Sequence, residues 1–99
     1  MREKLWTWGG TYFGYREGVK LWTYDGRNVG KFRGNAVFEV DGSYLGEIKN
    51  GKLITSKSKT SRGSSFSPSG DHVGEVPTVD RVGTVMLAGY EDFPGPEEF

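Results

Sequence analysis

The sequence predicts an all-β fold: a pseudo-four-fold repeat of short antiparallel β-hairpins in 16-residue units, arranged as a closed or flower-like meander. Three observations support this prediction. Glycines recur at a fixed interval, apolar residues keep the same interval, and glycine is too frequent for helix. Each interior glycine costs a helix about 1 kcal/mol relative to alanine, and this chain has 16 glycines in 99 residues.

The repeat interval is 16 residues, and it holds for glycine and for apolar positions alike. Two sets of glycines keep it: Gly10, Gly26, Gly42 and Gly14, Gly30, Gly46. Two apolar columns keep it as well: Leu5, Leu21, Val37, Leu53 and Trp6, Trp22, Phe38, Ile54. Because internal repetition at a fixed period is the signature of repeat architectures, we define repeats 5–20, 21–36 and 37–52, with a fourth unit beginning at 53.

Each repeat is expected to hold one hairpin. The segments that begin at Leu5, Leu21 and Val37 are rich in aromatic and β-branched residues, which favour strands. They run into the dipeptides Gly9-Gly10, Asp25-Gly26 and Asp41-Gly42. Such dipeptides favour type I′ turns, in which both central residues have positive φ. A further turn closes each unit near Gly18, Gly34 or Asn50-Gly51.

Gly14, Gly30 and Gly46 fall inside predicted strands, where glycine weakens the sheet. Their regular recurrence predicts that a large ring from a neighbouring strand lies over the bare backbone. The column Trp6, Trp22 and Phe38 supplies the candidate rings. A β-bulge at each glycine is the alternative.

Pairing across Asp25-Gly26 places Trp22 opposite Val29, and pairing across Gly34-Asn35 places Phe38 opposite Lys31. Both faces of the sheet are then partly apolar. One face carries Trp22, Tyr24, Val29, Phe38 and Val40, and the other carries Leu21, Phe32 and Val37. Since a free antiparallel sheet has one wet face, we expect closure, a covering segment or a subunit contact.

The chain is expected to form a single domain over residues 1–93. The fourth unit lacks its glycine-centred strand, which we expect to be completed by about residues 80–87, from segment 73–76 or segment 81–86. Residues 56–70 are rich in Ser, Lys and Thr and are predicted to form a surface loop. Residues 94–99 are predicted to be a flexible tail.

The run from Asp25-Gly26 through Val29-Gly30 to Phe32, followed by the segment from Asp41-Gly42 to Ile48, resembles the bacterial four-fold β-flower proteins. These are small domains of four repeated β-petals about a pseudo-four-fold axis. The ending from Ala88 to Pro94 also looks like one found in such chains. The resemblance covers residues 5–54 well and the rest weakly. It implies the fold, and it carries over no catalytic residue, because the family has no established activity.

Composition excludes several classes of protein. The chain has no Cys, so it has neither a disulfide framework nor a thiolate zinc site. No apolar run reaches the roughly 18 to 20 residues of a membrane span, and the first residues lack the apolar stretch of a signal peptide. We therefore expect a soluble, cytoplasmic protein. Charge is divided: residues 1–62 hold 12 basic and 6 acidic side chains, and residues 63–99 hold 1 and 7.

No residue pattern indicates catalysis or a cofactor. His72 is the single histidine, and as a metal ligand it would need partners that the composition does not offer, so we interpret it as a surface residue. The run Gly46 to Leu53 resembles a P-loop but lacks its final hydroxyl, and the repeat already explains both glycines. We predict that the protein is not an enzyme and binds no metal or cofactor.

The predicted function is a non-enzymatic β-repeat module that binds another protein or a copy of itself, and no membrane. The aromatic residues favour it: 10 of 14 lie in residues 5–54, and Trp and Tyr are enriched at interfaces. The alternative is a nucleic-acid or glycan binder that uses exposed rings and a basic stretch. That stretch comprises Lys49, Lys52, Lys57, Lys59 and Arg62.

Overall fold

The computed structural model describes residues 2–58, 65–72, 74, 79–81, 83 and 85–99. These residues form an all-β chain that ends in a single 3-10 turn, η1 (Pro96–Glu98), and include no α-helix. No helix among them is long and apolar enough to cross a membrane. The strands are β1 (Arg2–Thr7), β2 (Tyr12–Glu17), β3 (Lys20–Thr23), β4 (Asn28–Arg33), β5 (Ala36–Phe38), β6 (Tyr44–Lys49), β7 (Lys52–Ser56) and β8 (Tyr90–Asp92).

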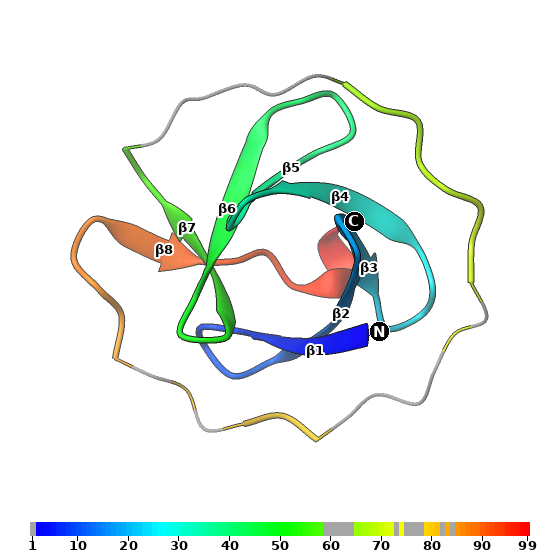
Figure 1. Cartoon of the computed structure of the whole chain (residues 1–99). Helices are drawn as coiled ribbons and strands as arrows, with labels where there is room; N and C mark the ends of the chain where they lie inside the picture. The colour runs from blue at the N-terminus through cyan, green and yellow to red at the C-terminus, as the bar shows by residue number, and fades with distance from the viewer. Residues whose placement is uncertain (1, 59–64, 73, 75–78, 82, 84) are drawn as a thin grey trace.

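The first seven strands close into a barrel (Figure 1). Each strand pairs antiparallel with the next, and β1 pairs with β7 through Trp6 opposite Lys52 and Thr7 opposite Leu53. This last pairing is parallel because strand direction alternates along a meander, so the first and seventh strands run the same way. Of the expected ways to bury both faces, closure of the sheet is therefore confirmed.

The hairpin turns inside the first three repeats differ from the predicted two-residue type. In each repeat a main-chain bond joins residues four apart, from Thr7 to Thr11, from Thr23 to Arg27 and from Glu39 to Ser43. The three-residue loops end in Gly10, Gly26 and Gly42, with φ of +98°, +94° and +90°. This is the geometry of a type I turn followed by a glycine with positive φ. The extra loop residue sets Trp22 opposite Asn28, so the predicted pairing with Val29 is wrong.

Gly14, Gly30 and Gly46 occupy the same place in three successive hairpins. They pair with Leu5, Leu21 and Val37, and a β-bulge follows that pair in each case. A Cβ would lie 2.1 Å from the Trp22 carbonyl oxygen at Gly14, 3.2 Å from that of Phe38 at Gly30 and 2.6 Å from that of Ile54 at Gly46.

The bulge alternative therefore describes the structure, and the prediction that the Trp6, Trp22 and Phe38 rings cover the glycines is wrong. Trp22 and Phe38 do lie against Gly14 and Gly30, but they do so through their main-chain carbonyl groups and not through their rings. At Gly46 a ring also approaches: a Phe93 ring carbon lies 2.6 Å from the position of a Cβ.

The barrel interior holds one apolar cluster. Its members are Leu5, Phe13, Leu21, Phe32, Val37, Leu45, Leu53 and Phe93, with Val29, Ile48 and Phe99 packed against it. The column of step 16, Leu5, Leu21, Val37 and Leu53, is completely buried in this cluster. Leu21, Phe32 and Val37 share a face as predicted. Val29 also faces this core, contrary to prediction, because the three-residue loop and the bulge shift its strand. The pairing of Phe38 with Lys31 is confirmed.

Beyond its pairing with β1 at Lys52 and Leu53, β7 pairs with β8, through Ile54 opposite Asp92 and Ser56 opposite Tyr90. The prediction that residues 80–87 complete this unit is therefore wrong: 80, 81, 83 and 85–87 are not in a strand, and 82 and 84 lie outside the described residues. The alternative segment 73–76 is described only at Gly74, which is not in a strand either.

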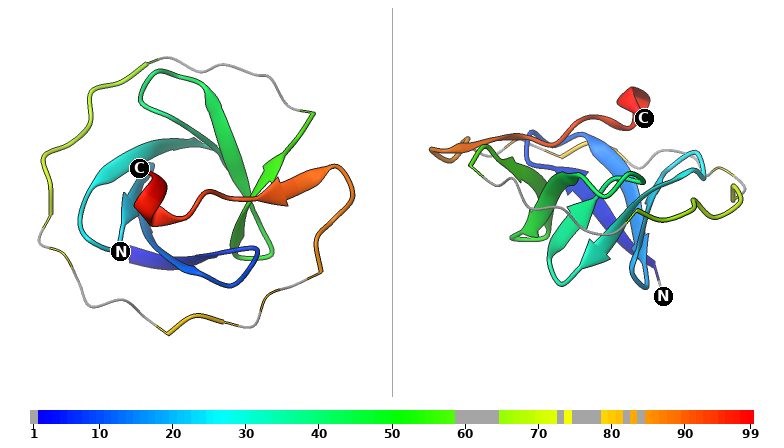
Figure 2. Two further views of the ribbon diagram at one scale, coloured as in Figure 1. Left: turned by 180° about the vertical axis from the view of Figure 1, so that it is seen from behind. Right: turned by 90° about the horizontal axis from the view of Figure 1, so that it is seen from above.

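Residues 94–99 fold back over one end of the barrel, so the predicted tail is wrong (Figure 2). The rings of Phe93 and Phe99 meet Phe13 edge-on, with centroids 5.3 and 5.5 Å away. The Arg27 guanidinium donates to the main-chain carbonyls of Pro96, at 3.1 Å, and Phe99. These contacts close the barrel mouth with aromatic rings.

Residues 57–89 connect β7 to β8, and we call this segment the belt. Ser56, placed in the predicted surface loop, belongs to β7, and residues 65–70 lie outside every strand. The described parts of the belt run around the outside of the barrel (Figures 1 and 2). The expectation of a covering segment is therefore met by the chain itself.

Candidate functional site

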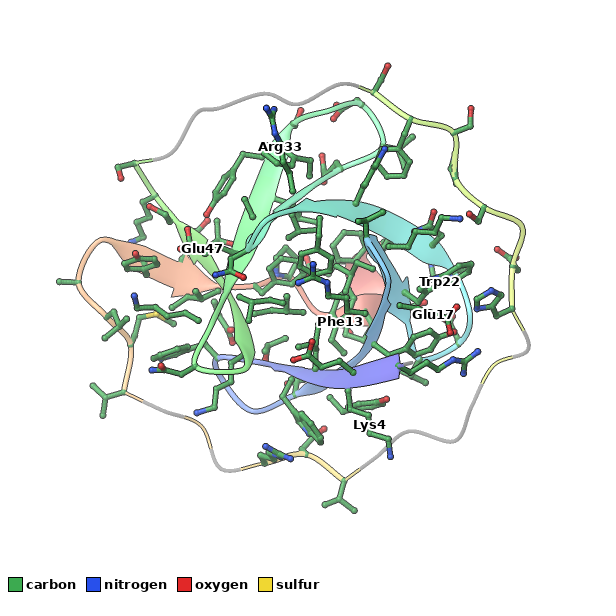
Figure 3. The ribbon with its side chains drawn as sticks, in the orientation of Figure 1. Lys4, Phe13, Glu17, Trp22, Arg33 and Glu47 are labelled. Carbon is green, nitrogen blue, oxygen red and sulfur yellow. The ribbon has the colours of Figure 1, made fainter. Side chains whose placement is uncertain are left out.

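The outer face of the barrel carries a set of large aromatic rings. Alternation along a strand turns every second side chain outward, and the inward position is taken by the column that begins at Leu5. Its outward neighbours Trp6 and Trp22 are 6% and 1% exposed although they face away from the core. In Figure 3, Phe13 lies inside the ring of strands, whereas Trp22 lies outside it, on the side of the belt. The belt therefore covers an aromatic outer surface.

The belt is held to the first repeat by main-chain and side-chain contacts around Arg81. Its N–H donates to the Gly10 carbonyl at 2.8 Å. Its guanidinium lies 3.6 Å from the centroid of the Trp6 ring. One residue earlier, an Asp80 carboxylate oxygen accepts a bond from the Tyr12 N–H at 2.9 Å. The Arg81 guanidinium therefore lies on the Trp6 indole, and a cation–π interaction of this kind stabilises a contact by about 0.5 to 2 kcal/mol.

Two indole groups of the first repeat bind the main chain of the belt. Trp6 Nε1 donates to the Val79 carbonyl at 3.1 Å, and Trp8 Nε1 donates to the Val85 carbonyl at 3.0 Å. A buried indole N–H needs an acceptor. Here the acceptors are the main-chain carbonyls of Val79 and Val85, which lie outside every strand, so the contact does not depend on the side chains of these residues.

The second repeat holds the belt in the same way around His72. The His72 N–H donates to the Gly26 carbonyl at 2.7 Å. Its ring stacks on Trp22, with centroids 3.5 Å apart and planes inclined by 13°. The Tyr15 hydroxyl lies 2.9 Å from His72 Nδ1. His72 is thus a half-buried anchor of the belt, and the interpretation as an ordinary surface residue missed this contact.

Trp22 differs from Trp6 in one respect. Its Nε1 is buried and finds no hydrogen-bond partner among the residues that the structure describes. The second repeat gains another polar contact instead, since the Ser69 N–H donates to Asn28 Oδ1 at 3.0 Å. The Asn28 side chain also donates to the carbonyls of Leu21 and Gly30, each at 3.0 Å.

The belt passes the third repeat near Phe66, whose N–H donates to the Val40 carbonyl at 3.0 Å. A pocket of about 580 Å³ lies beside this contact. Its lining comprises Asn28, Val29, Glu39, Val40, Asp41, Ser65, Phe66 and Phe99. A second pocket, of about 450 Å³, lies at the mouth closed by the chain end and is bordered by the acids Glu91, Asp92, Glu97 and Glu98.

Within the basic stretch, Lys49 and Lys52 pair across the turn between β6 and β7. Lys49 Nζ lies 5.8 Å from the centroid of the Tyr90 ring, and Lys52 Nζ lies 5.3 Å from that of Trp8. Lys57 is exposed. Lys59 and Arg62 lie outside the described residues. No group of three His, Asp or Glu side chains in the described part of the chain is placed to hold a metal ion.

Asp25 and Tyr44 have displaced pKa values. A hydrogen bond from the Thr23 hydroxyl lowers the pKa of Asp25 below its usual value, and Arg27 lowers it further, against the opposing effect of burial. Burial raises the pKa of Tyr44 to about 12, with the neighbouring Glu47 carboxylate adding to the rise. Asp25 is thereby held ionised, and it binds the Arg27 side chain that reaches the chain end.

Comparison with known proteins adds no relative. No family model, no curated protein and no solved structure matches this chain. Evidence for the function therefore comes from the contacts between the belt and the outer face of the barrel.

Proposed function

We propose that the protein is a non-enzymatic association module whose outer barrel face binds an extended peptide. In this structure the bound segment is the chain's own belt. The proposal agrees with the association predicted from the aromatic content, and it names the surface involved.

The observation that carries the proposal is the pair of indole bonds from Trp6 and Trp8 to main-chain carbonyls of the belt. Main-chain groups are common to all peptides, so donors aimed at carbonyls suit an extended segment of varied sequence. The same face supplies the Gly10 and Gly26 carbonyls as acceptors for N–H groups of the belt. Tryptophan is also among the residues that dominate binding energy at protein interfaces.

The four-fold β-flower architecture also belongs to this proposal. It is supported by three hairpins that share one register, each with a bulge after the glycine pair. A fourth hairpin is formed by β7 and β8, with the belt inserted between its strands. We infer that the belt is an insertion in the fourth petal.

Conservative variants of the indoles test the binding function. In Trp6→Phe and Trp8→Phe, a ring remains and the N–H donor is lost. Trp22→Phe is the matched control, because Trp22 Nε1 has no partner among the described residues. Peptides selected from a random display library on the intact protein should bind Trp6→Phe and Trp8→Phe more weakly, by about fivefold or more, and Trp22→Phe should lose less affinity, because it keeps an aromatic ring and loses no hydrogen bond among the described residues.

Light scattering over a concentration series completes this test by reporting self-association. A protein that stays strictly monomeric and selects no peptide would contradict the proposed function. Equal loss of binding in all three variants would contradict the role given to the indole donors.

Nucleic-acid or glycan binding has weaker support. Lys49 and Lys52 already lie over rings of the protein, and the aromatic face is covered by the belt. A salt titration with a single-stranded oligonucleotide distinguishes the two functions, since phosphate contacts weaken steeply as ionic strength rises. We expect no binding at low salt.

A further inference from the structure

The belt contains a short motif twice. Asp71-His72-Val73-Gly74 and Asp80-Arg81-Val82-Gly83 are nine residues apart, and each has a second valine two residues after its glycine. In both copies an acid is followed by a planar, nitrogen-bearing side chain and, two residues later, by glycine. The described residues of the two copies are Asp71, His72 and Gly74, and Asp80, Arg81 and Gly83.

The two copies meet equivalent places on the barrel. The second residue, Arg81 or His72, donates its N–H to the turn glycine, Gly10 or Gly26. Its carbonyl oxygen fills the space of the missing side chain there, 2.0 Å from a Cβ at Gly10 and 2.1 Å from one at Gly26. Gly10 and Gly26 are 16 residues apart, so the first and second barrel repeats each receive one copy of the motif.

The side chain of the second motif residue is also recognised twice. Arg81 lies over Trp6, and His72 stacks on Trp22. Trp6 and Trp22 are equivalent positions of the 16-residue repeat. Both a guanidinium and an imidazole present a flat face to an indole, so each site favours a planar, nitrogen-bearing side chain at the second position of the motif.

The close approach of the belt to the turn leaves little room for a side chain at the glycine of the motif. A Cβ at Gly83 would lie 2.7 Å from the Gly9 carbonyl oxygen, and a Cβ at Gly74 would lie 3.1 Å from that of Asp25. Gly9 and Asp25 are again equivalent positions. In the first repeat, Asp80 adds a carboxylate that accepts the Tyr12 N–H.

We infer that these two docking sites recognise the sequence (Arg or His)-x-Gly, that the first site also selects Asp before it, and that the partner is a protein that presents this motif in an extended segment. The inference rests on the proposed function and gives it a ligand class. The belt occupies both sites in the free protein, so a partner must displace it. Because the belt is part of the same chain, its effective concentration at these sites is high, and a partner must bind tightly enough to compete with it.

The test uses the intact chain and a fluorescently labelled synthetic peptide with the sequence of residues 79–86. The variant Asp80→Ala/Arg81→Ala weakens the internal copy of the motif while leaving the barrel residues unchanged. We expect this variant to bind the peptide at least about tenfold more tightly than the parent, because the competing internal segment is weakened. Circular dichroism and thermal unfolding establish that the variant is folded.

Three control peptides define specificity: one with Arg replaced by Ala, one with Gly replaced by Ala, and one with the same residues scrambled. Binding should fall most for the Gly replacement, because the added Cβ would meet the Gly9 carbonyl. A scrambled peptide that binds equally well would overturn the motif and leave the proposed function standing. A variant that binds none of the peptides and no second copy of the chain would overturn both.

A second copy of the chain is the competing occupant. If the labelled Asp80→Ala/Arg81→Ala variant binds the unlabelled parent protein, whose belt is intact, and does not bind the peptide, the occupant is another belt, and the inference of a separate motif-bearing protein is wrong.

Discussion

At the scale of single residues, the space around the mid-strand glycines decides which side chains the sheet accepts. The position of a Cβ at Gly46 is 2.6 Å from both the Ile54 carbonyl oxygen and a Phe93 ring carbon. The first contact is main chain and cannot rotate away. The 16-residue spacing was enough to identify these glycines as equivalent, but spacing alone does not distinguish a covering ring from an approaching carbonyl.

Gly46→Ala should therefore lower the free energy of unfolding by about 2 to 3 kcal/mol, the usual cost of overpacking. Gly70→Ala is the matched control, because nothing lies within 4 Å of a Cβ there, and it should change stability by less than about 1 kcal/mol. Urea unfolding measures both. Equal effects of the two substitutions would contradict the close approach at Gly46.

The Asp25 carboxylate makes the stability of the folded protein depend on pH. Its pKa in the folded protein lies below the unfolded value, chiefly because the Thr23 hydroxyl donates to it. Its contribution to stability is therefore present above the unfolded pKa and lost as the pH falls through the folded pKa. Thr23→Val removes the hydroxyl at similar volume and should raise the Asp25 pKa towards its usual value, 3.8. Carboxyl-carbon NMR titration measures this shift, and Thr23→Ser should largely restore the lowered pKa.

At the scale of elements, the order of strands followed from the sequence, and the details of their turns did not. Apolar runs and glycine dipeptides located the hairpins correctly. The dipeptides Gly9-Gly10 and Asp25-Gly26 suit both two-residue and three-residue loops, and the loop length sets the register. Only the three-dimensional pairing showed that Trp22 faces Asn28. The type I′ geometry instead matches Asn50-Gly51, where φ is +54° and +74° between the paired Lys49 and Lys52.

Asn50 is the one non-glycine among the described residues with positive φ. Alanine tolerates that conformation poorly, so Asn50→Ala should destabilise the protein by about 1 kcal/mol, whereas Asn50→Gly should be close to neutral. Asn35→Ala is the matched control, since Asn35 occupies the corresponding exposed turn without positive φ. Chemical denaturation compares the three variants, and a loss at Asn35 as large as at Asn50 would refute the backbone explanation.

At the scale of the whole molecule, the belt and the chain end were the parts that sequence reasoning missed. The described residues of the belt have no strand pairing, and the barrel positions that they contact exist only after the barrel has closed. The nine-residue spacing of the Asp71 and Asp80 segments was a readable signal, but its meaning depends on the turns it meets. Residues 94–99 have the composition of a tail, and only the packing of Phe93 and Phe99 on Phe13 shows their role.

Because Phe93 helps to close the barrel mouth, its replacement should strongly lower the stability of the protein. This ring is 3% exposed and belongs to the central cluster. Phe93→Ala should lower the free energy of unfolding by about 3 to 5 kcal/mol, as buried phenylalanines do. Val85→Ala, at a side chain that is 87% exposed, is the control and should have an effect below about 0.5 kcal/mol. Thermal unfolding followed by circular dichroism measures both, and a mild effect at Phe93 would mean that residues 93–99 are not part of the core.

The parallel pairing of β1 with β7 also sets an order for synthesis on the ribosome. Pairing between consecutive strands requires only neighbouring segments, so these hairpins can form while the chain emerges, but the ring itself closes between residues 46 positions apart, Trp6 and Lys52. Ring closure must wait until β7 has left the exit tunnel. The aromatic outer face is then complete before residues 71–85 follow, and for that interval a nascent chain presents it without its own covering segment.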